Sequence, residues 1–358
     1  MSLHIGIVGL ANVGKSTLFN ALTDAGALSA NYPFATIEPN TGVVAVPDKR
    51  LSVLGEMYET DKIVPATVEF VDIAGLIAGA SKGEGLGNKF LANIRECAVI
   101  CHVVRVFENG DIVRVEGSAD PEGDIETVET ELALSDIEVL ERAMDKIKKE
   151  AKAGIKEARE KLEIAERVLN DLKNGMTAVD SVPGLNLLCA KPCFFMFNMS
   201  EEQLTDKTLK ESLLKLINKN NKGRERRAVF VNAKLEEEML GMTEEDKNEF
   251  LESYGIEEDG LNQLVHVAYD TLGLMSFLTA GKKEVRAWTI KQGSTAPEAA
   301  GVIHTDFQKG FIAAQVCKYD DLIKLGSEKA VKEAGLLKTE GKDYVVQEGD
   351  VIEFRFNV

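Results

Sequence analysis

The residues Gly9-Leu-Ala-Asn-Val-Gly-Lys-Ser16 decide the fold. They fit the P-loop pattern G-x-x-x-x-G-K-S/T, and they lie between the apolar run Leu3–Val8 and the amphipathic stretch Ser16–Leu22, as a strand–loop–helix unit requires. The glycines let backbone N–H groups surround phosphate oxygens, and the helix N-terminus adds a partial positive charge. We expect Lys15 to reach the β- and γ-phosphates and the Ser16 hydroxyl to ligate Mg²⁺. The sequence therefore predicts a nucleoside triphosphate bound with Mg²⁺.

Two further segments carry polar residues that such a site needs. Asp72-Ile-Ala-Gly75 ends a predicted strand, so its carboxylate can hold Mg²⁺ through water and its glycine can respond to the γ-phosphate. Thr36 lies between the P-loop and this segment, in the position of a switch threonine that contacts Mg²⁺ and the γ-phosphate. The predicted Mg²⁺ ligands are Ser16, Thr36 and Asp72. The predicted catalytic residues are Lys15, Thr36, Asp72 and Gly75.

Apolar runs alternate with helical stretches through the first two thirds of the chain. Runs of this kind indicate a mostly parallel, doubly wound sheet, and thus an α/β fold. The predicted strands are Leu3–Val8, Gly42–Val46, Thr67–Val71, Ala98–Phe107, Pro192–Phe197 and Ala228–Val231.

A helical insertion interrupts this order between the fourth and fifth strands. One apolar stripe covers 125–147, and a second covers 155–172 with steps that alternate between three and four residues. The Ala153-Gly154 pair between the stripes predicts an antiparallel helical hairpin that projects from the sheet as an arm. Beyond Ala280-Gly281, a smaller α+β module is expected. Its predicted elements are strands at Val285–Ile290 and Val351–Phe356 and a helix at Ala296–His304.

Charge is distributed unevenly along the 358 residues, whose formal net charge is −17. Phosphate contacts need clustered Lys and Arg, so this charge speaks against general DNA binding but leaves room for a local basic patch. Eleven carboxylates accompany one arginine over 111–141, whereas 145–173 has nine basic residues against seven acidic ones. The ordinary interpretation of such charges is a solvated helix face.

No feature of the sequence indicates a membrane or an export route. No apolar run approaches the roughly 18 residues that a membrane helix needs, and the first residues predict a strand instead of a signal sequence. We interpret the five cysteines as reduced thiols, most of them in the core. The expected location is therefore the cytoplasm.

Base recognition departs from the pattern of a guanine site. Such a site needs Asn-Lys-x-Asp after a late strand, because the aspartate accepts hydrogen bonds from guanine and the lysine covers the ring. Here the strand that ends at Phe197 is followed by Asn198-Met-Ser-Glu201, which lacks the lysine and has glutamate in place of aspartate. A site that cannot pair with guanine's donors loses discrimination. The last element on the base side is predicted at Asn232-Ala-Lys234.

Several stretches together resemble the Obg-like ATPase family, and the resemblance covers essentially the whole chain. They are the P-loop, Asn31-Tyr-Pro-Phe-Ala-Thr-Ile-Glu-Pro-Asn-Thr-Gly42, Phe70-Val-Asp-Ile-Ala-Gly-Leu76, Gly79-Ala-Ser-Lys-Gly-Glu-Gly-Leu-Gly-Asn88, Asn198-Met-Ser-Glu201, Lys283-Glu-Val-Arg-Ala-Trp288 and Phe354-Arg-Phe-Asn-Val358.

The resemblance implies a translation-factor-class G domain that prefers ATP, with an inserted coiled coil and a C-terminal TGS domain of β-grasp type. The corresponding ranges are 1–122 and 185–280 for the G domain, 123–184 for the hairpin and 281–358 for the TGS domain. It also implies association with the ribosome (large subunit or 70S) through the coiled coil and the TGS domain.

The same resemblance assigns roles to individual residues. Adenine would be contacted by Asn198, Met199 and Glu201, and Asn12 matches the residue that ligates K⁺ in potassium-activated relatives. The complete set of expected nucleotide-binding residues is Asn12, Val13, Gly14, Lys15, Ser16, Thr17, Asn198, Met199, Glu201 and Asn232.

Two positions depart from known catalytic patterns. Leu76 follows Gly75 where Ras-like enzymes have the glutamine that orients water, which is usual for the family. Arg114 stands where some members carry a histidine proposed to help hydrolysis. A K⁺ ion at Asn12 would then neutralise charge in place of an arginine finger.

Three other functions use comparable sequence features. One is a GTPase with relaxed base choice that acts in ribosome assembly, and another is a nucleotide-gated binding module whose hydrolysis only resets it. A metabolite kinase is disfavoured, because no lid of clustered arginines is evident.

Overall fold

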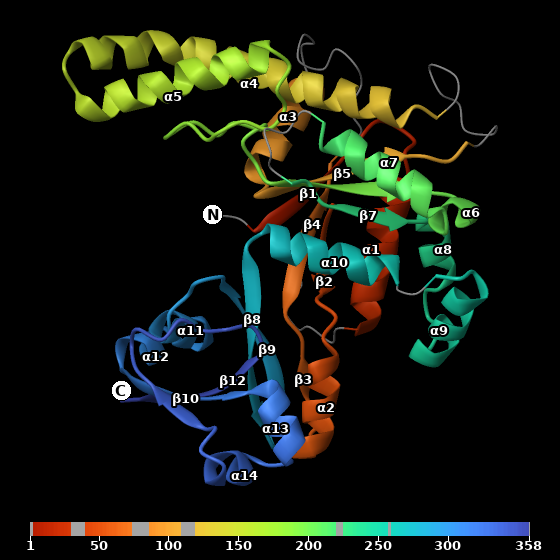
Figure 1. Cartoon of the computed structure of the whole chain (residues 1–358), viewed down its shortest axis with the longest axis vertical. Helices are drawn as coiled ribbons and strands as arrows, with labels where there is room; N and C mark the ends of the chain where they lie inside the picture. The colour runs from red at the N-terminus through yellow and green to blue at the C-terminus, as the bar shows by residue number, and fades with distance from the viewer. Residues whose placement is uncertain are drawn as a thin grey trace. The chain divides into compact units, whose positions relative to one another are not determined.

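The computed structural model describes residues 3–29, 40–73, 86–108, 119–219, 225–256 and 259–357. The chain divides into two compact units (Figure 1). The first comprises Met1–Val44 and Glu69–Ala268, and the second comprises Ala45–Val68 and Tyr269–Val358. The chain therefore passes from one unit to the other three times.

A six-stranded sheet with the order β2-β4-β1-β5-β6-β7 organises the described part of the first unit. The pairs β4–β1, β1–β5, β5–β6 and β6–β7 are all parallel, so the carboxyl ends of five strands share one edge. The predicted mostly parallel sheet is confirmed. Its strands are β1 His4–Val8, β2 Thr41–Ala45, β4 Thr67–Asp72, β5 Val99–Arg105, β6 Cys193–Asn198 and β7 Ala228–Val231.

Helices cover both faces of this sheet. In Figure 1, α3 and α4 lie on its upper side and α1 and α10 on its lower side, so the sheet is doubly wound. In the ranges that the structure describes, no helix combines the length and apolarity needed to cross a bilayer. The helices of the first unit are α1 Lys15–Ser29, α3 Leu86–Glu96, α4 Pro121–Lys152, α5 Lys156–Lys173, α6 Glu201–Leu204, α7 Lys207–Ile217, α8 Ala233–Glu238, α9 Glu244–Ser253 and α10 Gly260–Thr271.

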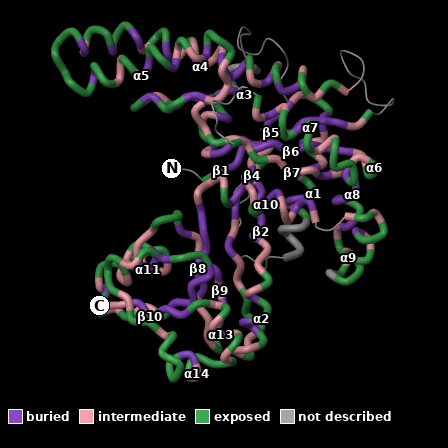
Figure 2. The backbone as a smooth tube through the Cα atoms, in the orientation of Figure 1, coloured by how far each residue is buried: buried purple, intermediate pink, exposed green. Residues whose placement is uncertain are grey.

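Helices α4 and α5 form the predicted hairpin. Buried positions alternate with exposed ones along both helices (Figure 2), and Leu140 and Ile147 of α4 share a core with Ala165 and Val168 of α5. Gly154 turns the chain between them with a φ of 90°, in the left-handed region that favours glycine.

A buried carboxylate fixes the base of the hairpin. Asp136 on α4 is 0% exposed and accepts hydrogen bonds from the backbone N–H groups of Leu188 (2.9 Å) and Cys189 (2.8 Å). Arg95 at the end of α3 pairs with Asp136 at 3.3 Å and donates to the Ser135 hydroxyl at 2.7 Å. Buried charges need such partners. The base of the hairpin is therefore an integral part of the first unit.

The described part of the second unit contains another six-stranded sheet, with the order β11-β10-β12-β8-β9-β3. Strand β8 pairs antiparallel with β9, β10 pairs antiparallel with β12, and β3 adds to β9 in parallel. The strands are β3 Ile63–Val64, β8 Leu274–Gly281, β9 Glu284–Lys291, β10 Phe311–Lys318, β11 Lys338–Glu340 and β12 Asp350–Phe356. The helices are α2 Lys49–Tyr58, α11 Ala296–Ile303, α12 Thr305–Lys309, α13 Tyr319–Leu325 and α14 Glu328–Glu333.

The units divide at different points from the expected boundary after residue 280. That boundary lies at the turn between β8 and β9, two strands that pair from Leu274↔Lys291 to Gly281↔Glu284. Both strands therefore belong to one sheet, and the second unit begins at Tyr269. The segment Ala45–Val68, expected as part of the G domain, also belongs to the second unit, because α2 and β3 pack on its sheet.

A buried glutamate joins α8 to α10 within the first unit. Glu236 is 4% exposed, and its Oε1 accepts a hydrogen bond from the N–H of Gly260 at 3.0 Å. Its other oxygen has no hydrogen-bond partner among the described residues. Burial, together with the negative charge of Asp259, raises the pKa of Glu236 to about 8. This carboxyl is therefore largely protonated at neutral pH.

The raised pKa of Glu236 predicts a particular dependence of stability on pH. The unfolded chain releases this proton near the ordinary glutamate pKa of 4.5, whereas the folded chain retains it up to about 8. Between these values the folded state binds more protons, so the free energy of unfolding falls as pH rises, by at most about 1.4 kcal/mol per pH unit. Glu236→Gln is expected to match the parent at pH 5 and to be more stable at pH 8 in chemical denaturation. Glu238→Gln, at an exposed position on the same helix, should keep the parental slope, and equal slopes in both variants would contradict the assignment.

Candidate functional site

The P-loop leaves β1 in a conformation that depends on glycine. Gly14 has a φ of 100°, and a Cβ atom there would lie 2.3 Å from the Nδ2 atom of Asn198. At Gly9 a Cβ atom would lie 2.5 Å from the carbonyl oxygen of Val103. Larger residues would thus displace the loop from the strands on which it rests. The glycines serve close packing as well as phosphate access.

Lys15 is the first residue of α1 and is only 7% exposed. Its Nζ donates a hydrogen bond to the carbonyl oxygen of Leu10 at 2.5 Å. Burial lowers the pKa of Lys15 to about 8, against the opposing effect of Asp72. A phosphate group beside the ammonium would raise the pKa again, because an opposite charge favours the charged form. Lys15 is therefore placed to gain from an anionic ligand.

Asp72 and Ser16 lie near Lys15, in the part of the site where the phosphates are expected; we call this part the phosphate end. Asp72 ends β4, and the nearby Lys15 ammonium and Ser16 side chain favour the charged form of its carboxyl group. Burial raises its pKa, and its Oδ1 has no hydrogen-bond partner in the described ranges. A buried carboxylate oxygen beside a hydroxyl group is a suitable donor set for Mg²⁺, which takes oxygen ligands and retains several waters. These two residues therefore fit the expected metal.

Asn198 connects three segments of the site. The side chain is 4% exposed at the end of β6. Its Nδ2 donates to the carbonyl oxygen of Val13 at 3.0 Å, and its Oδ1 accepts from the N–H of Ala233 at 3.1 Å. The amide thus joins the P-loop to the start of α8. The family resemblance implied an adenine contact for Asn198, and this positioning role was missed because it depends on long-range contacts.

The remaining residues of the base side occupy two short helix starts. Ser200 and Gln203 form a capping box at α6, which presents Glu201 in the first turn with an exposed side chain. The side chain of Asn232 caps α8 by accepting from Lys234 N and Leu235 N. These caps hold the two helix starts at the edge of the sheet.

Met199 lies between these features but is 0% exposed. It packs in a core cluster with Phe197 and Leu204, and its N–H donates to the carbonyl oxygen of Val231 at 2.9 Å. Among the three residues expected to contact adenine, Glu201 alone has an exposed side chain.

A cavity of about 1010 Å³ brings the two halves of the site together. Most of the predicted residues line it: Asn12, Gly14, Lys15, Ser16, Thr17, Asn198, Met199, Glu201 and Asn232. Val13 does not line the cavity but supplies the carbonyl that Asn198 binds.

Sequence reasoning missed several other lining residues. They follow the carboxyl ends of β5, β6 and β7, where ligands bind in open α/β sheets, so their position after predicted strands was an available signal. They are Phe107, Glu108, Ser200, Glu202, Gln203 and Glu237, whereas the lining residues Ala233 and Lys234 belong to the element predicted at Asn232-Ala-Lys234.

Some predicted residues cannot be placed in the site. Thr36, Gly75, Leu76 and Arg114 lie outside the described residues. His102 is described and is a core residue, as its apolar surroundings in the sequence indicate. It is 3% exposed, lies 5.1 Å from the Phe195 ring, and burial lowers its pKa to about 3.

Two protein-family models match parts of this chain. Residues 4–133 match the family MMR_HSR1, described as 50S ribosome-binding GTPase, and residues 274–357 match YchF-GTPase_C, described as Protein of unknown function (DUF933). The chain is 52% identical to the Ribosome-binding ATPase YchF of Haemophilus ducreyi over an alignment of 367 residues that covers all of both chains. The chain belongs to the YchF family. The resemblance to Obg-like ATPases is thereby confirmed.

Other YchF proteins agree with this assignment. The Ribosome-binding ATPase YchF of Bacillus subtilis is 48% identical over all of both chains. The solved structure of the Schizosaccharomyces pombe YchF GTPase is 37% identical and superimposes with a TM-score of 0.86, covering 99% of this chain and 98% of that one. The YchF fold is thus confirmed over both units. The names of these relatives differ on whether the nucleotide is ATP or GTP.

The bridging role of Asn198 predicts a specific loss on substitution. Asn198→Ala leaves the buried Val13 carbonyl and Ala233 N–H unpaired, and each lost partner costs about 1–3 kcal/mol. We expect lower stability together with nucleotide affinity weakened by about tenfold or more, measured by calorimetry. Asn218→Ala is the matched control, because Asn218 also bonds backbone groups in this unit but does not line the cavity. Equal losses of affinity in the two variants would contradict the bridging role.

Proposed function

We propose that this YchF-family chain hydrolyses ATP to ADP and phosphate as a Mg²⁺-dependent switch that binds the ribosome. One observation carries the proposal: a single cavity contains the P-loop lysine and serine at one end and Asn198-Met-Ser-Glu201 at the other. The first end is suited to a triphosphate, and the second lacks the lysine and the aspartate of a guanine site. The curated relatives are named ribosome-binding ATPases.

The phosphate chemistry is assigned to three residues of the first unit. Ser16 and Asp72 would hold Mg²⁺, which supplies positive charge to the β- and γ-phosphate oxygens when bound. Lys15 adds its ammonium charge from a buried position, where electrostatic stabilisation of the departing phosphate is stronger than in water. Thr36, from the position of a switch threonine, and Gly75, from the Asp72-Ile-Ala-Gly75 segment, are proposed to complete this end.

The base end favours adenine because it lacks the residues that recognise guanine. Met199 occupies the lysine position of a guanine site and is buried in the core, so it offers no charge to the base. Glu201 provides an exposed carboxylate that can accept a hydrogen bond from the adenine amino group. Phe107 also lines the cavity and provides an aromatic face against which a base can pack.

The proposed activity is tested by phosphate release and nucleotide competition. Lys15→Ala should lower turnover at saturating Mg-ATP by about 100-fold or more, the loss typical for one preorganised charge partner, with an unchanged circular dichroism spectrum. Lys207→Ala, at an exposed position on α7, is the control and should retain parental turnover.

ATP should compete at least as well as GTP for the parent protein. GTP binding tighter by about tenfold would instead favour the GTPase with relaxed base choice.

A monovalent cation is proposed to assist hydrolysis at Asn12. This residue has a φ of 61°, is exposed and lines the cavity, so its side-chain oxygen is available beside the P-loop. A K⁺ ion held there against the phosphates would neutralise charge that develops as the γ-phosphate departs.

If K⁺ binds at Asn12, the rate of hydrolysis should depend on which monovalent cation is present. Turnover should be faster in KCl than in NaCl at equal ionic strength, by an amount on the order of tenfold, equivalent to about 1.4 kcal/mol of barrier. Asn12→Ala should abolish the difference and largely retain ATP binding. General screening would treat the two salts alike. Equal rates of the parent protein in both salts would refute the ion.

The tip of the hairpin is proposed as a ribosomal contact. We define the tip as residues 146–161, which carry seven basic side chains against three acidic ones in a chain of net charge −17. Lys149 and Lys152 at the end of α4 and Lys156 at the start of α5 are exposed, and Ile155 between the helices is 47% exposed. A local basic patch of this kind suits phosphate groups of ribosomal RNA. The predicted TGS domain, residues 281–358, is the other candidate contact. A ribosomal partner implies a cytoplasmic location.

The tip is tested by charge reversal, because removing the whole hairpin would expose the core that it shares with the first unit. Lys149→Glu with Lys152→Glu should weaken co-sedimentation with ribosomes by about tenfold and reduce its salt dependence. Lys207→Glu with Lys215→Glu, at exposed positions on α7, is the matched control. Equal weakening in both pairs would mean that net charge, and not the tip, governs binding.

A further inference from the structure

The segment Ala45–Val68, which we call the insert, joins two strands of the nucleotide-binding unit but belongs to the second unit. One end continues from β2, and the other continues into β4, which ends at Asp72. We infer that the insert transmits the state of the nucleotide site to the second unit, so that this unit differs between the ATP-bound and ADP-bound protein. The inference rests on the proposed function.

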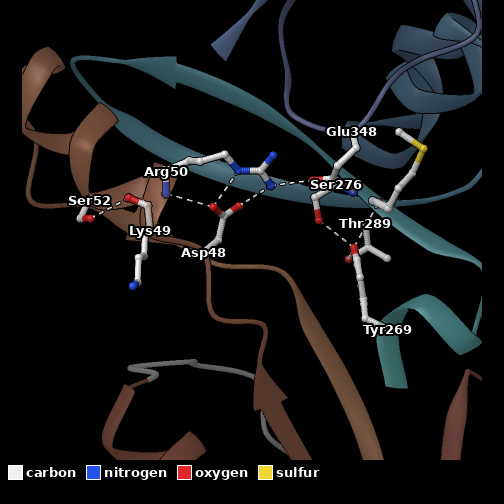
Figure 3. Close-up of polar contacts among 9 residues, drawn as sticks. Asp48, Lys49, Arg50, Ser52, Tyr269, Ser276, Thr289 and Glu348 are labelled. Carbon is white, nitrogen blue, oxygen red and sulfur yellow. Dashed lines mark hydrogen bonds and ion pairs between the residues drawn. The ribbon is translucent and has the colours of Figure 1, made fainter. Parts of the chain in front are cut away.

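An ion-pair network anchors the insert to the sheet of the second unit (Figure 3). Arg50 makes two hydrogen bonds of 2.8 Å to Asp48 and a third of 2.6 Å to Glu348. The other carboxylate oxygen of Glu348 accepts from the N–H of Ser276 on β8 at 2.7 Å. Asp48 also caps α2 by accepting from Arg50 N. Paired, partly buried charges of this kind are strong and directional.

Backbone pairing and packing anchor the insert at further points. Strand β3 pairs with β9, and the N–H of Val285 donates to the carbonyl oxygen of Lys62 at 3.0 Å. The Tyr58 hydroxyl donates to Glu328 at 2.5 Å. Leu51 and Leu54 of α2 are 3% and 0% exposed. The insert is thus packed into the second unit and is not a surface loop.

The insert is connected tightly to β2 and β4, the two strands on either side of it. Close to the border between the units, the N–H of Val46 donates to the carbonyl oxygen of Ala66 at 2.8 Å, so the two arms of the insert are bonded to each other. Only three residues separate Val68 from Asp72, all of them within β4. Any shift of Asp72 on binding Mg²⁺ and triphosphate would therefore reach the insert through a short stretch of one strand.

Helix α10 provides a second connection from the base end of the site, through hydrogen bonds and then along the helix itself. It begins at Gly260, whose N–H bonds Glu236 on α8, the helix whose first residue bonds Asn198. It continues across the border, and its Tyr269 hydroxyl lies 2.8 Å from the Ser276 hydroxyl and donates to Thr289 at 3.1 Å. The backbone N–H of Ser276 also donates to Glu348. The route through the insert and the route through α10 therefore both end at Ser276 on β8.

A ligand shifts an equilibrium only if it distinguishes between two states. The ATP analogue and ADP differ in the γ-phosphate, and the residue on the first route, Asp72, belongs to the phosphate end. A test of the coupling therefore measures the second unit at equal occupancy of the two nucleotides.

Hydrogen–deuterium exchange of the full chain, with ADP or with a non-hydrolysable ATP analogue, measures the coupling. In the parent protein, peptides covering 49–64 and 274–291 should exchange at rates that differ by about twofold or more between the two nucleotides. Arg50→Met, and separately Glu348→Gln, should reduce this difference at 274–291 by half or more. Both variants should keep nucleotide affinities within about threefold of the parent. Lys329→Ala, which removes an exposed ion pair on α14 outside the network, should keep the parental difference.

The outcomes distinguish the inference from the function on which it rests. A parent protein that binds neither nucleotide would overturn the proposed function. Tight binding with identical exchange of the second unit in both nucleotides would overturn the coupling alone. A parental difference that persists unchanged in both Arg50→Met and Glu348→Gln would overturn the role of the network.

Discussion

The site depends on the distance between the P-loop and the base-side helices, and the amide of Asn198 sets this distance. Because β1 and β6 are separated by β5, the two halves of the cavity have no direct strand pairing. The bonds from Asn198 to Val13 and Ala233 connect them in the interior, where an unmade hydrogen bond is costly. The glycine at position 14 is needed for the same reason, since any side chain there would occupy the space of this amide.

Near this connection, two charged groups at the phosphate end, Lys15 and Asp72, have shifted pKa values that a bound ligand would change. Lys15 has a lowered pKa and Asp72 a raised one, in both cases because of burial. Each shift reflects a penalty on the charged form that an opposite charge would relieve. Binding energy from a triphosphate and its metal would thus partly offset the burial of both groups. Neighbouring groups with perturbed pKa values, such as these two, are typical of functional sites.

Much of this could be predicted from the sequence. Local patterns were sufficient for the P-loop, for the strands of the first sheet and for the two stripes of the hairpin, because each depends on a periodicity that the chain carries locally. The insert could not be predicted in this way. Strand β3 has two residues, and its place beside β9 depends on a partner more than 200 positions further along the chain. The burial of Met199 and the bridge from Asn198 were missed for the same reason.

The discontinuity of the second unit has a consequence for the order in which the protein is made. Residues Ala45–Val68 are synthesised about 200 residues before Tyr269, where the rest of that unit begins. At typical elongation rates this interval lasts roughly 10 to 40 s. During this time, the apolar face of α2, with Leu51 and Leu54, has no sheet to cover it. The apolar face of α2 therefore stays uncovered during synthesis until β8 and β9, on which it packs, have been made.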